Sequence, residues 1–313
     1  MFQFVLDMAI SGGRAGRIFR KIRYWVLHFY DPIVHYTFNG KRIAIPLSHD
    51  LPFTRREYPT YSANLSRLAT FVRQWKGSLR MIDIGANIGD SHALAGSRPG
   101  DRFLLVDGDT KYLGVLTANT ADDKGVTLVH TMLSDRSGVT NAQFISEGGT
   151  SRVEATAVGA QGSTVYQTLD DLVRQHPDFA SVNLLKSDVD GYDSRVLVGA
   201  QGTIASACPV IFFEHHPHLL ALAKDDDTYI FSRLKTWGYS KLIFYDIKGF
   251  LLGVVDSDNE TLIKDLIFYA KSKEVLCYDV CGFHDRDAEA RDRFVVSEKA
   301  FYAGLIASRF VKA

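Results

Sequence analysis

The sequence predicts an α/β protein built on a doubly wound, mostly parallel sheet. Short apolar runs recur along the chain and alternate with helical patterns, as strands do in βαβ units. The first clear run, 80–84, passes at once into a turn that carries Gly85 and Gly89. Four acidic residues end or follow such runs, and ligands of these sheets bind outside the carboxyl ends of the strands. These acids are Asp83, Asp107, Asp188 and Glu214.

The 313 residues suit one large domain with additions at its ends. We divide the chain into an N-terminal helix and hairpin extension at 1–62, a cofactor-binding core at 63–255, and a C-terminal segment at 256–313. The C-terminal segment reads as helix, strand and helix, and we expect it to complete the sheet.

The N-terminal extension begins with a basic amphipathic helix. An apolar stripe at helical spacing has a basic flank within residues 14–29. The stripe consists of Ile18, Ile22, Trp25, Val26 and Phe29, and the flank of Arg14, Arg17, Arg20, Lys21 and Arg23. Such a helix either docks on its own domain or lies on an anionic membrane surface, so peripheral membrane contact through residues 14–29 is one of two interpretations.

The elements that follow are marked by turn and cap residues. Asn39-Gly40 predicts a hairpin within 36–46. A helix follows at 62–75, with Ser62 or Asn64 as its N-cap. The parallel strands are expected at 80–84, 103–107, 126–130, 182–187 and 209–213. A glycine-bearing loop at 147–152 could close over a ligand, and a capping box from Thr168 to Asp171 opens the helix before the fourth strand. A hairpin (240–246 and 250–255), a helix (259–273) and a strand (274–281) complete the pattern.

Composition excludes some functions. Lys and Arg together number 36, and so do Asp and Glu, without long runs of either sign. The sequence therefore contains no cluster of basic residues of the kind that binds nucleic acid. No stretch reaches the roughly twenty apolar residues that span a bilayer. The three cysteines are too few for a disulfide framework, and we expect a cytoplasmic protein, with the inner face of the membrane as the alternative site.

The turn after the first strand indicates a nucleotide cofactor and favours S-adenosylmethionine (SAM). A dinucleotide fingerprint needs Gly-x-Gly-x-x-Gly, whereas Gly85 is followed by Ala86, Asn87 and Ile88 before Gly89. The Asp83 carboxylate would repel an anionic pyrophosphate but would attract the ammonium group of a methionine. Because the glycines of the turn have no Cβ, the backbone of the turn would contact the ligand. A nicotinamide dinucleotide is the alternative that this spacing disfavours.

A second carboxylate fits the same site. Asp107 ends another apolar run about twenty residues further on, the position from which an acid binds both ribose hydroxyls. Gly108 follows it and completes the predicted cofactor contacts on this side. Asp107 and Asp109 could instead be turn formers around Gly108.

The segment from Asn183 to Tyr192, with Lys186, Asp188 and Gly191, resembles the FkbM family of SAM-dependent methyltransferases. That family has Lys-Ile-Asp-Val-Glu-Gly at this place and a later Leu-x-Gly-Ala, here Leu197-Val198-Gly199-Ala200. The turn at 83–89 and Leu133-Ser134-Asp135 match as well. The resemblance runs from about 80 to 215 and implies a class I, Rossmann-like methyltransferase fold, with Asp135 among the cofactor contacts. Where the family has Glu-Pro-Asn-Pro, this chain has Asp107-Gly108-Asp109-Thr110.

The resemblance implies O-methylation of a hydroxyl on a sugar, a glycan or glycolipid precursor, or a secondary metabolite. Asp188 is the first candidate for the general base that takes the hydroxyl proton, with Lys186, Glu214 and His215 behind it. Asp188 could also be a capping acid, and Lys186 an ion-pair partner of Asp188 or Asp190.

Metal assistance is a further option. Asp188, Glu214 and His215 could bind Mg²⁺, Mn²⁺ or Zn²⁺, although residues 214–218 could equally form a polar loop. The alternative to an enzyme is a SAM-binding regulatory or scaffold module whose chemistry has lapsed. The joint presence of five residues argues against a lapse, because folding alone does not require them all. They are Asp83, Gly85, Gly89, Asp107 and Asp188.

Overall fold

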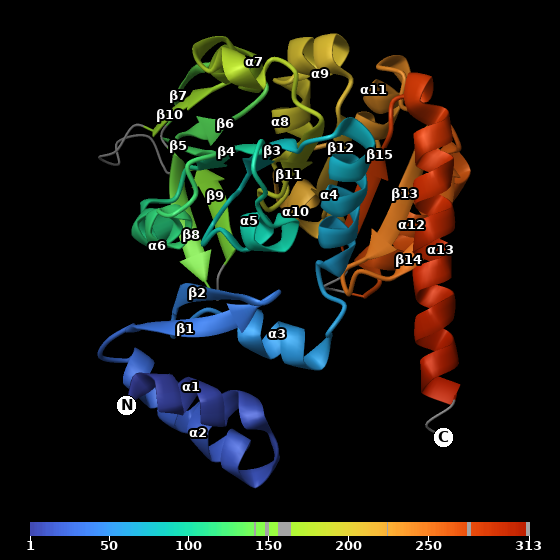
Figure 1. Cartoon of the computed structure of the whole chain (residues 1–313). Coiled ribbons are helices and arrows are strands. Elements are labelled where there is room, and N and C mark those ends of the chain that lie inside the picture. Colours follow the sequence, from blue (N-terminus) through green and yellow to red (C-terminus); the bar gives the residue numbers. More distant parts are fainter. Residues whose placement is uncertain (141, 148–149, 156–163, 224, 274–276, 311–313) are drawn as a thin grey trace.

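A computed structural model describes the whole chain except residues 141, 148–149, 156–163, 224, 274–276 and 311–313. Its centre is an eight-stranded sheet whose strands follow the order β14-β13-β15-β12-β11-β3-β4-β5 (Figure 1). These strands are β3 (Arg80–Ile84), β4 (Arg102–Asp107), β5 (Val126–His130), β11 (Leu184–Ser187), β12 (Val210–His215), β13 (Lys241–Asp246), β14 (Leu251–Asp256) and β15 (Tyr278–Gly282).

The expected doubly wound, mostly parallel sheet is confirmed. β3 pairs in parallel with β4 and with β11, and parallel pairing continues to β5 on one side and β12 on the other. The C-terminal strand β15 does not lie at an edge: it is inserted between β12 and β13 and is antiparallel to both. Residues that follow the parallel strands therefore meet at one edge of the sheet.

Helices cover both faces of this sheet because successive side chains of a strand point to opposite faces. Met81 of β3 belongs to one apolar cluster, with side chains of α4, α5 and α13. Ile82 and Ile84 belong to a second cluster, with side chains of α7, α8, α9, α11 and α12. The helices of the first face are α4 (Ala63–Lys76), α5 (Asp90–Ala95) and α13 (Ala288–Phe310). Those of the second are α7 (Leu169–Gln175), α8 (Asp193–Val198), α9 (Gln201–Ala207), α11 (Tyr229–Thr236) and α12 (Glu260–Lys271).

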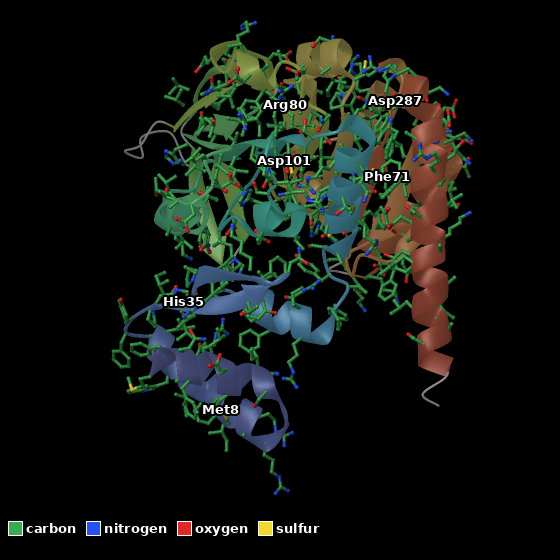
Figure 2. All side chains as sticks on the ribbon, in the orientation of Figure 1. Met8, His35, Phe71, Arg80, Asp101 and Asp287 are labelled. Atoms are coloured by element: carbon green, nitrogen blue, oxygen red, sulfur yellow. The ribbon has the colours of Figure 1, made fainter. Side chains whose placement is uncertain are left out.

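Aromatic packing attaches the long C-terminal helix to this framework. Phe71 of α4 lies 5.2 Å from Phe294 of α13, measured between ring centroids, and its position beside α13 is labelled in Figure 2. Helix α6 (Thr110–Thr120) follows β4, and α10 (Pro217–Ala223) follows β12. Among the helices in the described ranges, none combines the length and the apolar character needed to cross a bilayer.

The N-terminal extension lies beside the edge of the sheet that carries the turn after β3 (Figure 1). It contains α1 (Phe2–Ser11), α2 (Gly13–Leu27), the hairpin β1 (Ile33–Phe38) and β2 (Lys41–Pro46), and α3 (Leu51–Glu57). The hairpin turns at Asn39 and Gly40, both with positive φ, as the sequence indicates. Ser62 precedes α4 but makes no capping hydrogen bond with its side chain.

Small strands fill the segment between β5 and α7. β6 (Met132–Leu133), β7 (Gly138–Thr140) and β10 (Thr164–Gln167) form a three-stranded sheet. β8 (Ala142–Glu147) and β9 (Thr150–Ala155) pair with each other where the sequence suggested a loop, and the glycines 148–149 of that loop lie outside the described residues. The Thr168 hydroxyl caps α7 by accepting from Asp171 N (3.0 Å). The reciprocal half of the box is absent, because Thr168 N donates to Ser137 Oγ instead.

Candidate functional site

The turn after β3 places backbone at the carboxyl edge of the sheet. Gly85, Asn87 and Gly89 all have positive φ, at 77°, 47° and 83°. A Cβ on Gly85 would lie 1.9 Å from the carbonyl oxygen of Asp188. Glycine at 85 therefore lets this turn approach the end of β11, in addition to the ligand contact that the sequence suggested.

Asp107 is held rigidly at the end of β4. Its carboxylate accepts hydrogen bonds from Asn87 N (2.6 Å) and Asp109 N (2.7 Å), which joins the two loops that follow β3 and β4. Burial raises the pKa of Asp107, while the two backbone N–H groups oppose the rise. A carboxylate has about four lone-pair directions. The side chain therefore keeps acceptor capacity for the two hydroxyls of a ribose.

A cleft opens between these loops and the end of β11, with about 610 Å³ of space that includes open solvent. Its walls combine apolar side chains with a few polar groups. It is lined by Ile84, Gly85, Asn87, Val106, Asp107, Gly108, Thr131, Met132, Leu133, Asp188, Val189, Asp190 and Tyr192. The apolar members suit a flat base, and Asp107 at the wall suits the sugar attached to it. Gly85, Asn87, Asp107, Gly108 and Asp188 thus lie where the sequence placed them.

Four other predicted cofactor contacts do not line the cleft. Ala86 is fully buried in the core on the α4 side, and Gly89 packs its backbone toward Leu116 of α6. Asp135 is exposed and bonds Ser134, because its loop packs against Gly199 instead of bending into the cleft. Asp83 is fully buried and forms an ion pair with Lys186.

Lys186 is the centre of the site's electrostatics. Its Nζ lies 3.1 Å from Asp83 Oδ1 and 3.5 Å from Asp188 Oδ2, and donates to the Gly85 carbonyl at 3.1 Å. Burial lowers the pKa of the Lys186 ammonium, but the negative charges of Asp83, Asp188 and Asp90 raise it above the ordinary value. The ion-pair interpretation of Lys186 is therefore confirmed, with Asp83 as an additional and nearer partner.

Carboxylates outnumber cations around Lys186. Asp90, Glu214 and Asp279 each interact electrostatically with Asp188. Burial raises the pKa of Asp279 to about 7, and its Oδ2 accepts from Asn64 of α4 (2.8 Å). Burial also raises the pKa of Asp90 and of Glu214. Sequence reasoning missed Asp90 and Asp279 as site residues. Asp90 directly follows the turn, but Asp279 arrives only through the insertion of β15.

Glu214 and His215 point to opposite faces of the sheet, as neighbours in a strand must. Glu214 accepts a hydrogen bond from Cys277 Sγ (3.0 Å) and interacts electrostatically with Asp188. His215 packs against Phe231 of α11 at 4.8 Å between ring centroids, within the second apolar cluster, and burial lowers its pKa to about 4. The structure therefore does not bring His215 together with Asp188 and Glu214, as the predicted catalytic and metal roles require. Within the described ranges, no three His, Cys, Asp or Glu side chains are grouped to hold a metal ion, and the set Asp188, Glu214 and His215 is not assembled.

The N-terminal extension brings two residues, His49 and Tyr61, near the carboxylates around Lys186, which the sequence did not indicate. The His49 side chain, after β2, hydrogen-bonds that of Asn87; burial lowers the pKa of His49, and Asp90 opposes that change. Tyr61 precedes α4. Its pKa is raised well above the ordinary value, first by burial and then by the negative charges of four carboxylates. These are Asp188, Glu214, Asp90 and Asp279.

Comparisons with known proteins identify the family of the chain. A family model described as the methyltransferase FkbM domain matches residues 83–241. No curated protein matches the chain. Among solved structures, a methyltransferase FkbM from Methylobacillus flagellatus KT is 20% identical over 50% of this chain and 37% of its own, with a TM-score of 0.34. The chain thus spans well under half of that protein.

Two further structures are more distant in sequence. A precorrin-6y C5,15-methyltransferase from Geobacter metallireducens GS-15 is 15% identical, covers 70% of this chain and 87% of its own, and has a TM-score of 0.36. An O-methyltransferase from Bacillus cereus, in complex with SAH, is 10% identical, with 70% and 80% covered and a TM-score of 0.37. The FkbM model itself covers just over half of the chain. The protein therefore belongs to the FkbM methyltransferase family.

Proposed function

We propose that the protein transfers the methyl group of SAM to a hydroxyl of a sugar, a glycan or glycolipid precursor, or a secondary metabolite. One observation carries this proposal: an excess of carboxylates over cations at the end of the cleft, where Lys186 is surrounded by acids. Such a site attracts a positively charged ligand and repels pyrophosphate. SAM is cationic at its methionine end, whereas a nicotinamide dinucleotide is anionic.

The residues of the cleft fit this donor. Asp107, with both oxygens fixed by backbone N–H groups, would hold the ribose hydroxyls. The apolar wall that includes Met132 and Leu133 would contact the base. Bound there, SAM supplies a methyl group on a positively charged sulfur, so little further activation of the methyl is needed. The contribution of the chain is then to position the acceptor oxygen and remove its proton.

Two carboxylates are candidates for that proton transfer. Asp188 lines the cleft with half of its side chain exposed, and Glu214 lies behind it with a raised pKa. As the bond from the acceptor oxygen to the methyl carbon forms and the carbon–sulfur bond breaks, the hydroxyl proton would pass to one of them. Lys186 is already occupied by Asp83 and Asp188, so we assign it a positioning role. His49 and Tyr61 would border the acceptor.

The test is transfer of labelled methyl from SAM to a panel of hydroxylated sugars, glycolipids and secondary metabolites. We expect incorporation that falls at least about 100-fold in Asp188→Asn or Glu214→Gln, the range typical of a lost general base. SAM binding without transfer to any acceptor would favour the lapsed regulatory or scaffold module. Preferential binding of NAD would refute the donor assignment. The same assay with chelator and added Mg²⁺ tests whether a divalent cation takes part beside Asp188 and Glu214.

We place the reaction in the cytoplasm. This assignment is supported by the free thiols of Cys208, Cys277 and Cys281, which are typical of a reducing compartment. Fractionation of cells that express the full chain would test it, and recovery of the protein outside the cytoplasmic membrane would contradict it.

A further inference from the structure

Helices α1 and α2 form a hairpin that projects from the rest of the molecule, beyond the β1–β2 ribbon (Figure 1). One side of α2, continued by the turn after it, exposes large apolar side chains. Trp25 is 65% exposed and Phe29 76% exposed. We call this surface the α2 face and define it by Arg14, Arg17, Ile18, Lys21, Ile22, Trp25 and Phe29.

Four of the five residues of the apolar stripe of α2 are exposed and do not dock on the protein itself: Ile18, Ile22, Trp25 and Phe29. The opposite side of the helix makes the internal contacts: Gly16 lies under the backbone of α1, and Val26 and Leu27 pack on the core. Arg23, also on that side, donates to the carbonyl oxygens of Leu47 and Ser48. The packed side thus fixes the helix in place and leaves the α2 face outward.

Cations lie along the apolar residues on this face. At about 100° per residue, Arg14 and Lys21 fall on the same side of α2 as Trp25, with Arg17 next to them. All three cations are exposed. Residues 1–30 contain five Lys or Arg against one acid, Asp7, a net charge of +4 in a chain whose total is zero. Aromatic and aliphatic side chains beside cations are typical of helices that lie in a membrane interface.

We propose that the α2 face binds an anionic lipid bilayer surface, with α2 lying parallel to it. Trp25, Phe29, Ile18 and Ile22 enter the boundary between headgroups and acyl chains, and the three cations contact lipid phosphates. A second copy of the chain fits this face less well. A two-fold dimer would bring the same cations of both copies together, and their repulsion would oppose it.

The experiment is co-sedimentation of the full chain with vesicles of phosphatidylcholine and phosphatidylglycerol at 3:1, compared with phosphatidylcholine alone. We expect binding to the mixed vesicles that weakens with added salt. The triple variant R14E/R17E/K21E should bind about 100-fold more weakly or worse, since each cation near an anionic surface contributes roughly a factor of five. Trp25→Ser with Phe29→Ser should weaken binding to both kinds of vesicle.

Phe268→Ser is the matched control, because Phe268 of α12 is also 76% exposed but lies on another surface. It should sediment like the unaltered chain. No sedimentation with the mixed vesicles at low salt, or equal sedimentation of the charge-reversed variant, would overturn the proposal. Size-exclusion chromatography supplies another check: a dimer that the Trp25 and Phe29 substitutions dissociate would assign the face to a second copy and also overturn it.

Discussion

Replacing Lys186 with Met removes the only cation that lies within ion-pair distance of Asp83 among the described residues. Lys186 is 3% exposed and Asp83 is 0% exposed, so the carboxylate cannot turn to water. Removing one partner of a buried ion pair costs about 3–5 kcal/mol, because the remaining charge stays buried without compensation. That is a large part of the roughly 5–15 kcal/mol by which proteins of this kind are stable.

Urea unfolding at pH 8 measures this effect. With a slope of about 3 kcal/mol per molar urea, the midpoint of Lys186→Met should fall by 1 M or more. The double variant Asp83→Asn with Lys186→Met should recover most of the loss, since it removes both members of the buried pair. Lys241→Met is the matched control: Lys241 pairs with Asp256 at the surface, 3.5 Å apart and half exposed, so we expect a change of at most about 1 kcal/mol.

The pH dependence of the free energy of unfolding is a second measure of the same ion pair. Burial raises the pKa of Asp83 to about 6, with Lys186 opposing the rise. The folded state therefore binds the Asp83 proton more tightly than the unfolded chain, and this contribution to stability is lost as pH rises through the folded-state pKa. Without Lys186 that pKa rises further. Lys186→Met should accordingly cost less stability at pH 5 than at pH 8. An equal cost at both values, or a double variant no more stable than the single one, would refute the charge-pair account.

Three other predictions concern the cleft and its supports. Asp107→Ala should weaken SAM binding by at least about 1 kcal/mol in calorimetry, because a charged acceptor is lost; unchanged affinity would remove the ribose assignment. Gly199→Ala should lower the free energy of unfolding by about 1–3 kcal/mol, since its Cβ would lie 2.0 Å from the Ser134 carbonyl oxygen, whereas Gly304→Ala, with open space around it, should not. If Glu214 is the base, activity should rise with pH through its raised pKa, and Glu214→Gln should flatten that profile; an unaltered profile would exclude it.

The sequence alone determined the framework of the cleft, because those signals are local. A run of apolar residues that ends at a glycine-bearing turn predicts β3 and the turn at 85–89. A second apolar run, which ends in Asp107, predicts β4 in the same way. The residues Gly85, Asn87, Asp107, Gly108 and Asp188 line the cleft because the carboxyl ends of parallel strands meet at one edge.

Tertiary structure decided what surrounds this framework. Asp279 joins the acidic group because β15 is inserted between β12 and β13, a pairing between segments distant in sequence. His49 and Tyr61 reach the site because the N-terminal extension folds over the edge of the sheet. His215 lies away from Glu214 for a simpler reason: adjacent strand residues face opposite ways, so the two side chains cannot both point to the same face of the sheet.

Helix α2 shows most clearly the difference between what the sequence predicts and what the tertiary structure decides. The periodicity of the sequence predicts the apolar stripe and the basic flank, but it does not predict whether another part of the protein packs on the apolar side. Only the packing of Gly16 on α1 and the bonds from Arg23 to the chain after β2 fix which side is inside. The physical reason is general: local spacing sets which residues share a face, and long-range contacts set what that face meets.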